Sequence, residues 1–555
     1  MSQAEVKRKR ARIACEPCRE RKRKCDGAEP CSTCSEWAYD CYYDRQPRRR
    51  RTTHQETPTE FAPELRSPQH KAPASVNHGL VRRLEANSGA AFVRKMGLKI
   101  DPAKAPKLSL FGWNIGKRYL SSELGNVDSA LSITEITSLE HMKHLAQVYF
   151  DKVDPCYGFI DRCQFFERLS ARWISPSASE LYDSVIGGVA ALGCLFSQRN
   201  VTMTEIHLVG SASSSLELHV LSGAPPVDLL TGWTLRVIYM RMTDSPHSTW
   251  MASSRLMHLV EAAGFHLEST DSVFPRSSTT DCDPELRRRL FGVAQHMNMW
   301  TSYDLGLSRV SFQKNDLPLP PSTRPGDFTH EVLGLLPVSA SLDPGKSKEG
   351  EVDLETTLSD TIDGIHNEPP SIMAQCNLAL CILRRIHTQN FDIPSHLAER
   401  VLALLKKGLN CSRTMVMNCT PWHQMANVPF QITCVLLVMD TRPSLSMLPE
   451  AMQTLKLVAS TYDTDTMREA WGAARLLVML HQQRRKDDIA IFSESLDLEQ
   501  QEGPFGPSPQ ENPSAEEYSW LGALVADLPG LQRVDLDQFL NADMIDSSSF
   551  LGGSG

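Results

Sequence analysis

Six cysteines near the start of this 555-residue chain constrain its fold more than any other feature. They are spaced C-x2-C-x6-C, and after five residues the same pattern repeats, from Cys15 to Cys41. The segment between them contains no Leu, Ile, Val, Met or Phe, so hydrophobic burial cannot hold it together. C-x2-C pairs without histidine are typical of zinc sites. We therefore expect the metal ligands to be these six thiolates: Cys15, Cys18, Cys25, Cys31, Cys34 and Cys41.

The ligand count favours two zinc ions. One tetrahedral zinc would leave two cysteines over, and two separate ions would need eight ligands, whereas six suffice if two cysteines bridge. The internal repeat suggests that Cys15 and Cys31 are the bridging residues. Two Zn²⁺ and six thiolates leave a negative cluster that nearby cations would stabilise. The first half of the repeat supplies these cations: Arg19, Arg21, Lys22, Arg23 and Lys24.

This segment resembles the DNA-binding domain of the fungal binuclear zinc cluster transcription factors. The cysteine spacing, the basic run that ends in Lys24-Cys25-Asp26 and the Pro30-Cys31 pair carry the resemblance. It implies that one zinc is held by Cys15, Cys18, Cys25 and Cys31, and the other by Cys31, Cys34, Cys41 and Cys15. It also implies that a short helix enters the major groove, with Arg21 and Lys22 at base edges and Arg19 and Lys24 at phosphates.

A disulfide knot and a purely structural zinc knuckle both account less well for the cysteines. A disulfide knot would suit a secreted chain, but the residues before Cys15 contain no apolar signal segment. A structural or metal-storage knuckle would not need five cations between Cys18 and Cys25. We therefore predict a DNA-binding cluster at residues 15–44.

Charge is distributed very unevenly along the chain, whose formal net charge is −8. Residues 1–51 contain 15 Lys or Arg and 8 Asp or Glu, whereas residues 494–555 contain 12 acidic residues and one Arg. This asymmetry favours nucleic acid as the partner of one end and proteins as partners of the other. A basic arm at residues 1–14 and a second basic run, Arg48, Arg49, Arg50 and Arg51, suit phosphate contacts and nuclear import.

Residues 45–133 are expected to be a disordered, proline-rich linker with one candidate short helix at residues 79–98. Leu80 and Leu84 begin a heptad-like pattern there, which makes a homodimer a candidate state. Asn87, Ser88 and Gly89 interrupt this pattern before three heptads are completed.

Residues 134–490 are predicted to form a large all-α regulatory domain, because apolar residues recur at helical spacing and alternating strand patterns are nearly absent. Helices are expected near 133–153, with Thr134 or Ser138 as the possible cap, and near 183–198, 202–222, 227–242, 248–264, 284–306, 371–389, 394–418, 428–438, 446–461 and 464–484. A surface loop is expected at residues 321–370, which contain Pro, Gly and a charged run. The remaining nine cysteines are expected to be reduced and buried.

Three segments of this region, 149–169, 248–268 and 285–310, resemble the fungal-specific regulatory domain, or middle homology region, of the same family. Gly292 stands where that family's pattern often has an aromatic residue.

We expect no enzymatic activity, because the region lacks HExxH, GxSxG, P-loop and dinucleotide-binding motifs. His141 and His144, three residues apart, are interpreted as surface residues. The triplet Arg287–Arg289 is assigned to the charged face of a helix. A ligand pocket stays open as a minor alternative.

Residues 491–555 are predicted to be a disordered acidic activation tail. Bulky apolar side chains lie among its acids in two groups with helical spacing: Trp520, Leu521 and Leu524, then Leu536, Phe539 and Leu540. Such tails fold as short helices in coactivator grooves. A solubilising tail, or a helix that packs back on the regulatory domain, is the alternative.

Taken together, these features predict a mostly α, sequence-specific RNA polymerase II transcription factor of the nucleus. Its expected cofactors are two Zn²⁺ ions, and its expected partners are DNA with CGG-type half-sites and the transcription machinery, without a membrane. We expect an activator. The alternatives are a repressor and, from another class, a metabolite-binding or enzymatic protein with a nucleic-acid tether.

Overall fold

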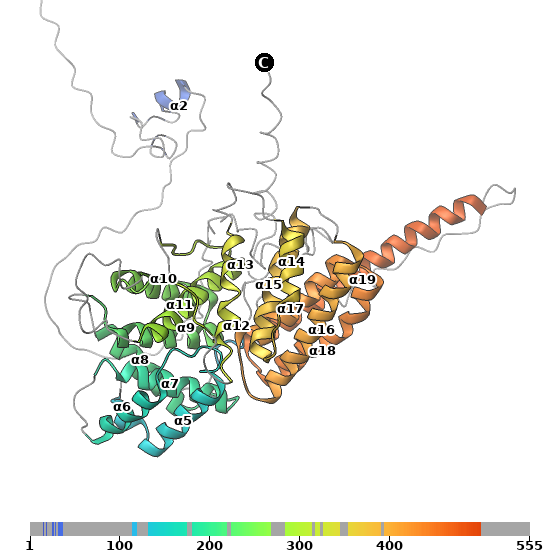
Figure 1. Cartoon of the computed structure of the whole chain (residues 1–555). Coiled ribbons are helices and arrows are strands. Elements are labelled where there is room, and N and C mark those ends of the chain that lie inside the picture. The colour runs from blue at the N-terminus through green and yellow to red at the C-terminus, as the bar shows by residue number, and fades with distance from the viewer. Residues whose placement is uncertain are drawn as a thin grey trace, which may run out of the picture. The chain divides into compact units, whose positions relative to one another are not determined.

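The chain separates into two compact units, residues 1–79 and residues 80–555, which are treated one at a time (Figure 1). The computed structural model describes residues 15, 18, 25, 26, 28, 31–36, 114–118, 131–174, 180–218, 224–267, 283–312, 317–321, 326–343, 353–389 and 393–500. The predicted linker helix at 79–98 and most of the predicted acidic tail lie outside these residues.

Every regular element in these ranges is an α-helix, so the mostly α fold class is confirmed. In the first unit the helix is α2 (Ser32–Glu36). The second unit contains α4 (Ile133–Ile136), α5 (Leu139–Lys152), α6 (Arg162–Ile174), α7 (Asp183–Ser197), α8 (Met203–Leu218), α9 (Val227–Thr243), α10 (Pro246–Ala262), α11 (Pro284–Leu305), α12 (Thr329–Leu333), α13 (Leu336–Ser341), α14 (Leu354–Asp363), α15 (Pro369–Thr388), α16 (Ser395–Met417), α17 (His423–Met439), α18 (Arg442–Thr461) and α19 (Asp465–Gln500).

Two helices that are apolar on nearly every side organise the second unit. Helix α7 contacts α5, α8 and α9, and helix α17 contacts α15, α16, α18 and α19. Because nearly every residue of both helices is buried, the polar ones included, each is stable only when neighbours cover it all round. Figure 1 accordingly shows α5–α11 gathered around one side of the unit and α14–α19 around the other. We call these the N-terminal and C-terminal halves. The expectation of an internal helix at 183–198 is confirmed.

Close approach within the N-terminal half depends on a glycine. A Cβ atom at Gly193 of α7 would lie 2.2 Å from the carbonyl oxygen of Leu145 in α5. Any larger residue would therefore push α5 away from α7, and the apolar contact between these helices would be lost.

The surface loop expected at residues 321–370 instead contains three helices, α12, α13 and α14. Several of their apolar residues are buried, and Leu333 and Leu358 fully so. The prediction missed these helices because each is short and the Pro, Gly and charged residues between them are typical of loops. Packing against α12 also accounts for Gly292, the departure from the family pattern, because a Cβ at this position would lie 2.7 Å from Leu333 Cδ1.

The arginine triplet of α11 was wrongly assigned to a charged surface. Arg289 is fully buried and forms ion pairs with Glu285 and Asp327. Arg287 is also buried and donates to the carbonyl groups of Phe265 and Gly264. Helical periodicity suggests only that such residues share a face; it cannot detect acceptors that other segments bring to that face.

Residues 114–118, assigned to the linker from the sequence, are bound firmly to the helical unit, and we call them the strap. The Asn114 side-chain amide donates to the carbonyl oxygens of Arg241 and Asp244, at 3.1 and 2.8 Å. Ile115 is fully buried, and its carbonyl accepts a 2.6 Å hydrogen bond from Thr464 Oγ1. The strap therefore joins the end of α9 to the start of α19.

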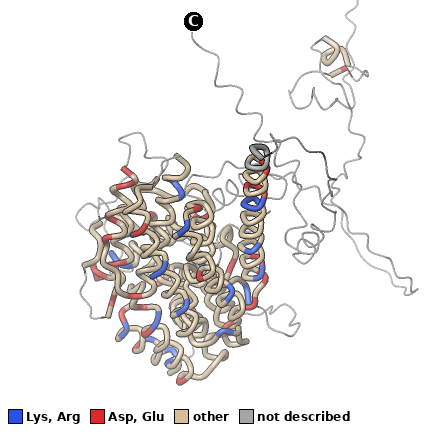
Figure 2. Tube along the Cα trace, turned by 90° about the vertical axis from the view of Figure 1, so that its right-hand side faces the viewer, with Lys and Arg blue, Asp and Glu red and all other residues tan. Residues whose placement is uncertain are grey.

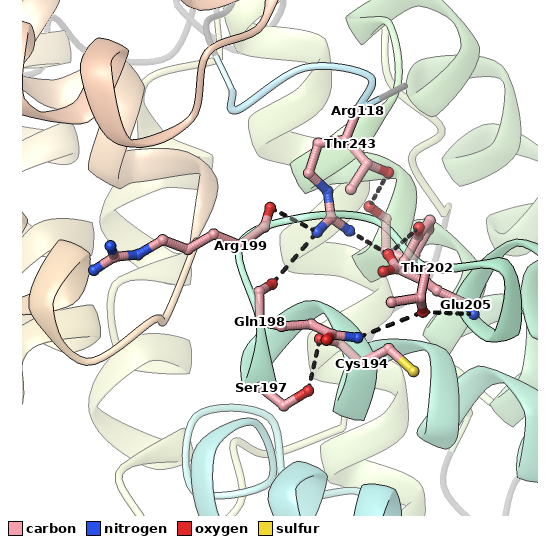
Figure 3. A network of polar contacts seen from close by, with 9 residues as sticks. Arg118, Cys194, Ser197, Gln198, Arg199, Thr202, Glu205 and Thr243 are labelled. Carbon is pink, nitrogen blue, oxygen red and sulfur yellow. Dashed lines mark hydrogen bonds and ion pairs between the residues drawn. The ribbon is translucent and has the colours of Figure 1, made fainter. Parts of the chain in front are cut away.

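Arg118 completes the attachment (Figure 3). Its guanidinium donates to the carbonyl oxygens of Gln198 and Arg199, in the connection between α7 and α8, and pairs with Glu205 of α8. Glu205 is fully buried and also accepts a 2.7 Å hydrogen bond from the Tyr239 hydroxyl. Burial raises the pKa of Glu205, and Arg118 opposes this shift by favouring the carboxylate.

Strap geometry also depends on Gly116. Its φ of 75° lies in the left-handed region, and a Cβ there would lie 2.4 Å from Thr466 Oγ1 in α19. A side chain at this position would be strained and would also separate the strap from α19.

The last helix is longer than its sequence pattern predicted. Helix α19 continues to Gln500, beyond the expected end at 484. Its outer part carries both basic and acidic side chains (Figure 2), and Gln483 donates to Asp487 one turn away. Good helix formers and such pairs support a helix without a buried face, which hydrophobic periodicity does not detect.

Most of the scattered cysteines are buried as predicted, but Cys163 is exposed and Cys419 is half-buried. Cys282 lies outside the described residues. Among the helices that the structure describes, none has the length and apolar composition needed to cross a membrane.

Removing the cation of the strap should destabilise the helical unit. Arg118→Met leaves the buried Glu205 carboxylate without its ion pair, so we expect a loss of about 3–5 kcal/mol in the free energy of unfolding. Lys117→Met, at the exposed neighbouring position, should change it by less than about 0.5 kcal/mol. Chemical denaturation measures both. An Arg118→Met protein as stable as wild type would contradict the role assigned to this pair.

The helical unit should also be sensitive to acid. Burial, aided by the nearby Arg241 guanidinium, lowers the pKa of His296 to about 3. Below pH 6.5 the unfolded chain binds a proton that the folded chain refuses, so the stability contributed by neutral His296 is lost as the pH falls. We expect about 2 kcal/mol less stability from this residue at pH 5 than at pH 7.5. His296→Gln should remove that part of the pH dependence, whereas exposed His141→Gln should leave it unchanged.

Candidate metal centre and nucleic-acid interface

The first unit brings five of the six predicted zinc ligands together. The sulfur of Cys15 lies 3.6 Å from those of Cys31 and Cys34, and the sulfur of Cys18 lies 3.6 and 3.9 Å from the same two atoms. A tetrahedral zinc with Zn–S bonds of about 2.3 Å requires sulfur separations of about 3.8 Å. The four thiol groups of Cys15, Cys18, Cys31 and Cys34 therefore fit one tetrahedral zinc ion as they stand.

Cys25 extends this group on one side, because its sulfur lies 3.8 Å from that of Cys15. Cys15 thus has three close sulfur neighbours, Cys25, Cys31 and Cys34. Cys18 and Cys34, which the family resemblance assigns to different ions, also lie within 3.9 Å of each other. Terminal ligands of two separate ions should lie farther apart than this. Cys41, the sixth ligand, lies outside the described residues.

Cys31 occupies a special position, directly before α2. Its carbonyl accepts the N–H of Ser35 at 2.9 Å, and its sulfur accepts the N–H of Cys34 at 3.4 Å. Burial acts to raise the pKa of Cys31, but the Cys34 N–H and the neighbouring cysteine side chains outweigh it and lower the pKa to about 6. A thiolate is therefore favoured where zinc needs one.

Asp26 is a structural residue of the cluster whose role the sequence did not reveal. Its two carboxylate oxygens accept the backbone N–H of Ala28, at 3.2 Å, and of Ser32, at 3.1 Å. These hydrogen bonds, above all those from Ser32, lower the pKa of Asp26. The carboxylate thereby ties the end of the first half of the repeat to the start of the second. Its sequence signal is an aspartate directly before a turn, where such side chains commonly accept local N–H groups.

The cations predicted to contact DNA all lie outside the described residues: Arg19, Arg21, Lys22, Arg23, Lys24, Arg48, Arg49, Arg50 and Arg51. The same is true of the six predicted activation residues of the tail, from Trp520 to Leu540. Their roles remain predictions from sequence and resemblance.

Comparisons with known proteins bear on both units. A family model described as "Fungal Zn(2)-Cys(6) binuclear cluster domain" matches residues 13–50. A second model, described as "Fungal specific transcription factor domain", matches residues 146–407. A binuclear Zn(2)-Cys(6) cluster contains two zinc ions, so the predicted cofactors are confirmed.

Several curated proteins resemble the chain over nearly its whole length. Protein RDR1 of Gibberella zeae is 42% identical over 97% of this chain and 99% of its own. Transcription factor kojR of Aspergillus oryzae is 35% identical over 93% of this chain and 91% of its own. Protein RDR1 of Saccharomyces cerevisiae is 28% identical over 87% of this chain and 91% of its own.

The two cysteines that are predicted to bridge, Cys15 and Cys31, should matter most for metal binding. Cys15→Ala and Cys31→Ala each remove a ligand from both ions, so we expect loss of both zinc ions, whereas Cys18→Ala should retain one. Native mass spectrometry of the intact chain measures the zinc content. The exposed Cys163→Ala serves as a control and should keep two zinc ions. Complete loss of zinc from Cys18→Ala, with one ion retained by Cys15→Ala, would reverse the ligand assignment.

Proposed function

The chain belongs to the fungal Zn(2)-Cys(6) binuclear cluster transcription factors, and from this premise we propose that it activates transcription from CGG-type half-sites. Members of this family are DNA-binding regulators and not enzymes. The observation that carries the proposal is the combination of a six-thiolate cluster with five cations between Cys18 and Cys25.

Base preference follows from the chemistry of those cations. Arg and Lys side chains form their best base contacts with O6 and N7 of guanine in the major groove. We assign base contacts to Arg21 and Lys22, and phosphate contacts to Arg19 and Lys24, with Arg23 as a further DNA-binding cation. The run from Arg48 to Arg51 adds phosphate contacts that carry no sequence information.

Activation is assigned to residues 494–555, with contacts to coactivators through Trp520, Leu521, Leu524, Leu536, Phe539 and Leu540. A tail that only increased solubility would have little use for so many bulky apolar side chains. Repression is the alternative, and the assay of the tail distinguishes the two.

The basic arm at residues 1–14 supports a nuclear location. Pairing of two copies through residues 79–98 is the candidate route to a homodimer.

The DNA contacts can be separated by their sequence dependence. Lys22→Ala should relax discrimination at one base pair by about 1–3 kcal/mol, because a base-edge contact is lost. Arg48→Ala should weaken binding to all sequences alike and reduce its salt dependence, because only a phosphate contact is lost. Binding-site selection with the wild-type protein, followed by salt titrations of the variants, tests both. Recovery of AT-rich sites would overturn the assignment.

The tail can be tested apart from its own DNA-binding unit. Residues 494–555 fused to an unrelated DNA-binding domain should raise the output of a reporter gene. Trp520→Ala with Phe539→Ala should abolish that rise, because both helical faces lose their largest side chain, whereas Gln532→Ala should not. A silent fusion would refute activation by the tail, and a lowered output would favour repression.

A further inference from the structure

Helix α17 begins inside the protein. His423 is its first residue, Trp422 is the residue before it, and both are buried. No side chain caps this end of the helix. The first N–H groups of a helix need acceptors from outside it, and the helix dipole makes this end positive. Acceptors, and anionic ones above all, are therefore favoured at this buried end.

Side chains around the same end have polar atoms without partners. Trp422 Nε1, His423 Nε2 and Asn427 Nδ2 make no hydrogen bond with any described residue, and neither does the buried side-chain oxygen of Gln424, which can only accept. Their side chains are only 2–4% exposed, and Asn427 lies one helical turn from His423 on the same face. An unsatisfied buried donor costs about 1–3 kcal/mol. Four buried polar atoms without a partner among the described residues thus lie between Trp422 and Asn427.

The N-terminal half supplies the other side of this cluster. The Tyr157 ring lies between those of His296 and Trp422, with centroids 5.8 and 5.2 Å away. Arg241 of α9 forms an ion pair with Asp304 of α11, but its Nε has no partner among the described residues. This guanidinium is near enough to help burial lower the pKa of both His296 and His423. The cluster thus spans both halves of the unit.

We propose that the helical unit binds a small carboxylic acid at the N-terminus of α17, between its two halves. The carboxylate would accept hydrogen bonds from the first turn of α17 and from the side chains of Trp422 and His423. The rings of Tyr157 and Phe196, the latter 4.9 Å from that of Trp422, suit an aromatic or planar body.

The chemistry of the cluster distinguishes this ligand class from others. A metal ion needs several ligand atoms with free lone pairs; Trp422 Nε1 and Asn427 Nδ2 offer none, which leaves only His423 Nε2 and Gln424 Oε1. Arg241 is already neutralised by Asp304, so a single negative charge is matched better than a phosphate dianion. The site is remote from the zinc cysteines in sequence and does not depend on the proposed promoter preference or on activation.

One residue connects this site to the strap. The Arg241 side chain borders the carboxylate site, and its backbone carbonyl accepts the 3.1 Å hydrogen bond from Asn114. A bound acid would therefore lie directly beside the point at which the chain from the DNA-binding unit joins the helical unit.

Thermal unfolding of the full-length, zinc-loaded protein tests the proposal. Sodium benzoate, acetate and formate are compared with sodium chloride at equal ionic strength, and benzamide serves as the uncharged analogue of benzoate. Benzoate should raise Tm more than chloride or benzamide does. Trp422→Phe and His423→Leu should weaken benzoate binding roughly tenfold each, because each removes one donor. Trp422→Phe also leaves a cavity in the core and should lower the Tm of the protein without benzoate, so the benzoate shift of each variant is measured against its own Tm without benzoate.

Trp250→Phe is the matched control. Trp250 Nε1 donates to the carbonyl of Ser308 at 2.9 Å, so this variant should lower Tm without benzoate and keep the benzoate shift. If benzoate acted on the zinc cluster instead, the benzoate shift in Tm would persist in all three variants, because each variant keeps every cysteine. If Trp422→Phe fails to fold, Asn427→Leu supplies the same comparison.

Indole ¹⁵N NMR gives a direct measurement. The Trp422 N–H signal, identified by its loss in Trp422→Phe, should shift on addition of benzoate, and the Trp250 signal should not. The proposal is overturned if none of the three carboxylates raises Tm beyond chloride, if benzamide acts equally, or if the variants retain the benzoate shift. If ordered water occupies the cluster instead, benzoate should raise the Tm of neither the wild-type protein nor the variants beyond the effect of chloride.

Discussion

Thiolate bonding to zinc is the constraint on which the DNA-binding unit depends. The segment from Cys15 to Cys41 has almost nothing apolar to bury, so its folding free energy must come from metal ligands. Two features of the chain support that bonding locally. The Cys34 N–H stabilises the Cys31 thiolate, and Asp26 holds the two halves of the repeat together. Because the metal supplies the stability, the surface of this unit is left available for cations that contact DNA.

The helical unit is stabilised by the opposite chemistry. Its two central helices, α7 and α17, are covered by other helices. Burial of the apolar side chains of all these helices supplies most of the favourable free energy of folding. Within this apolar interior lie arginine–carboxylate pairs such as Arg172 with Asp183 and Arg241 with Asp304. A buried pair of this kind contributes little net stability, but either residue alone is very costly. Such pairs therefore penalise every packing in which the two partners fail to meet.

The sequence predicted those features that depend on residues close together in the chain. It did not predict contacts between residues that are far apart in the chain. Cysteine spacing identifies the metal centre, because zinc ligands must sit on a short chain at fixed intervals. Helical periodicity identifies the long helices for the same reason. The strap has no comparable pattern, since Asn114 and Ile115 bind residues far away in the sequence. Arg289 shows the same limit, because its partner Asp327 lies in a stretch that looked like a loop. Buried donors such as Trp422 Nε1 become visible only when the packing around them is known.

The strap also has a consequence for how the protein is made. Ile115 and Thr464, which are joined by a hydrogen bond, are 349 residues apart. At a synthesis rate of about 5–20 residues per second, roughly 20–70 s pass between the appearance of these two residues. Throughout that interval the residues that cover Ile115 in the folded protein have not all been synthesised, although synthesis of the DNA-binding unit is already complete. Docking of the strap against α19 must therefore be among the last steps of folding on the ribosome, and a truncated chain that lacks α19 cannot complete it.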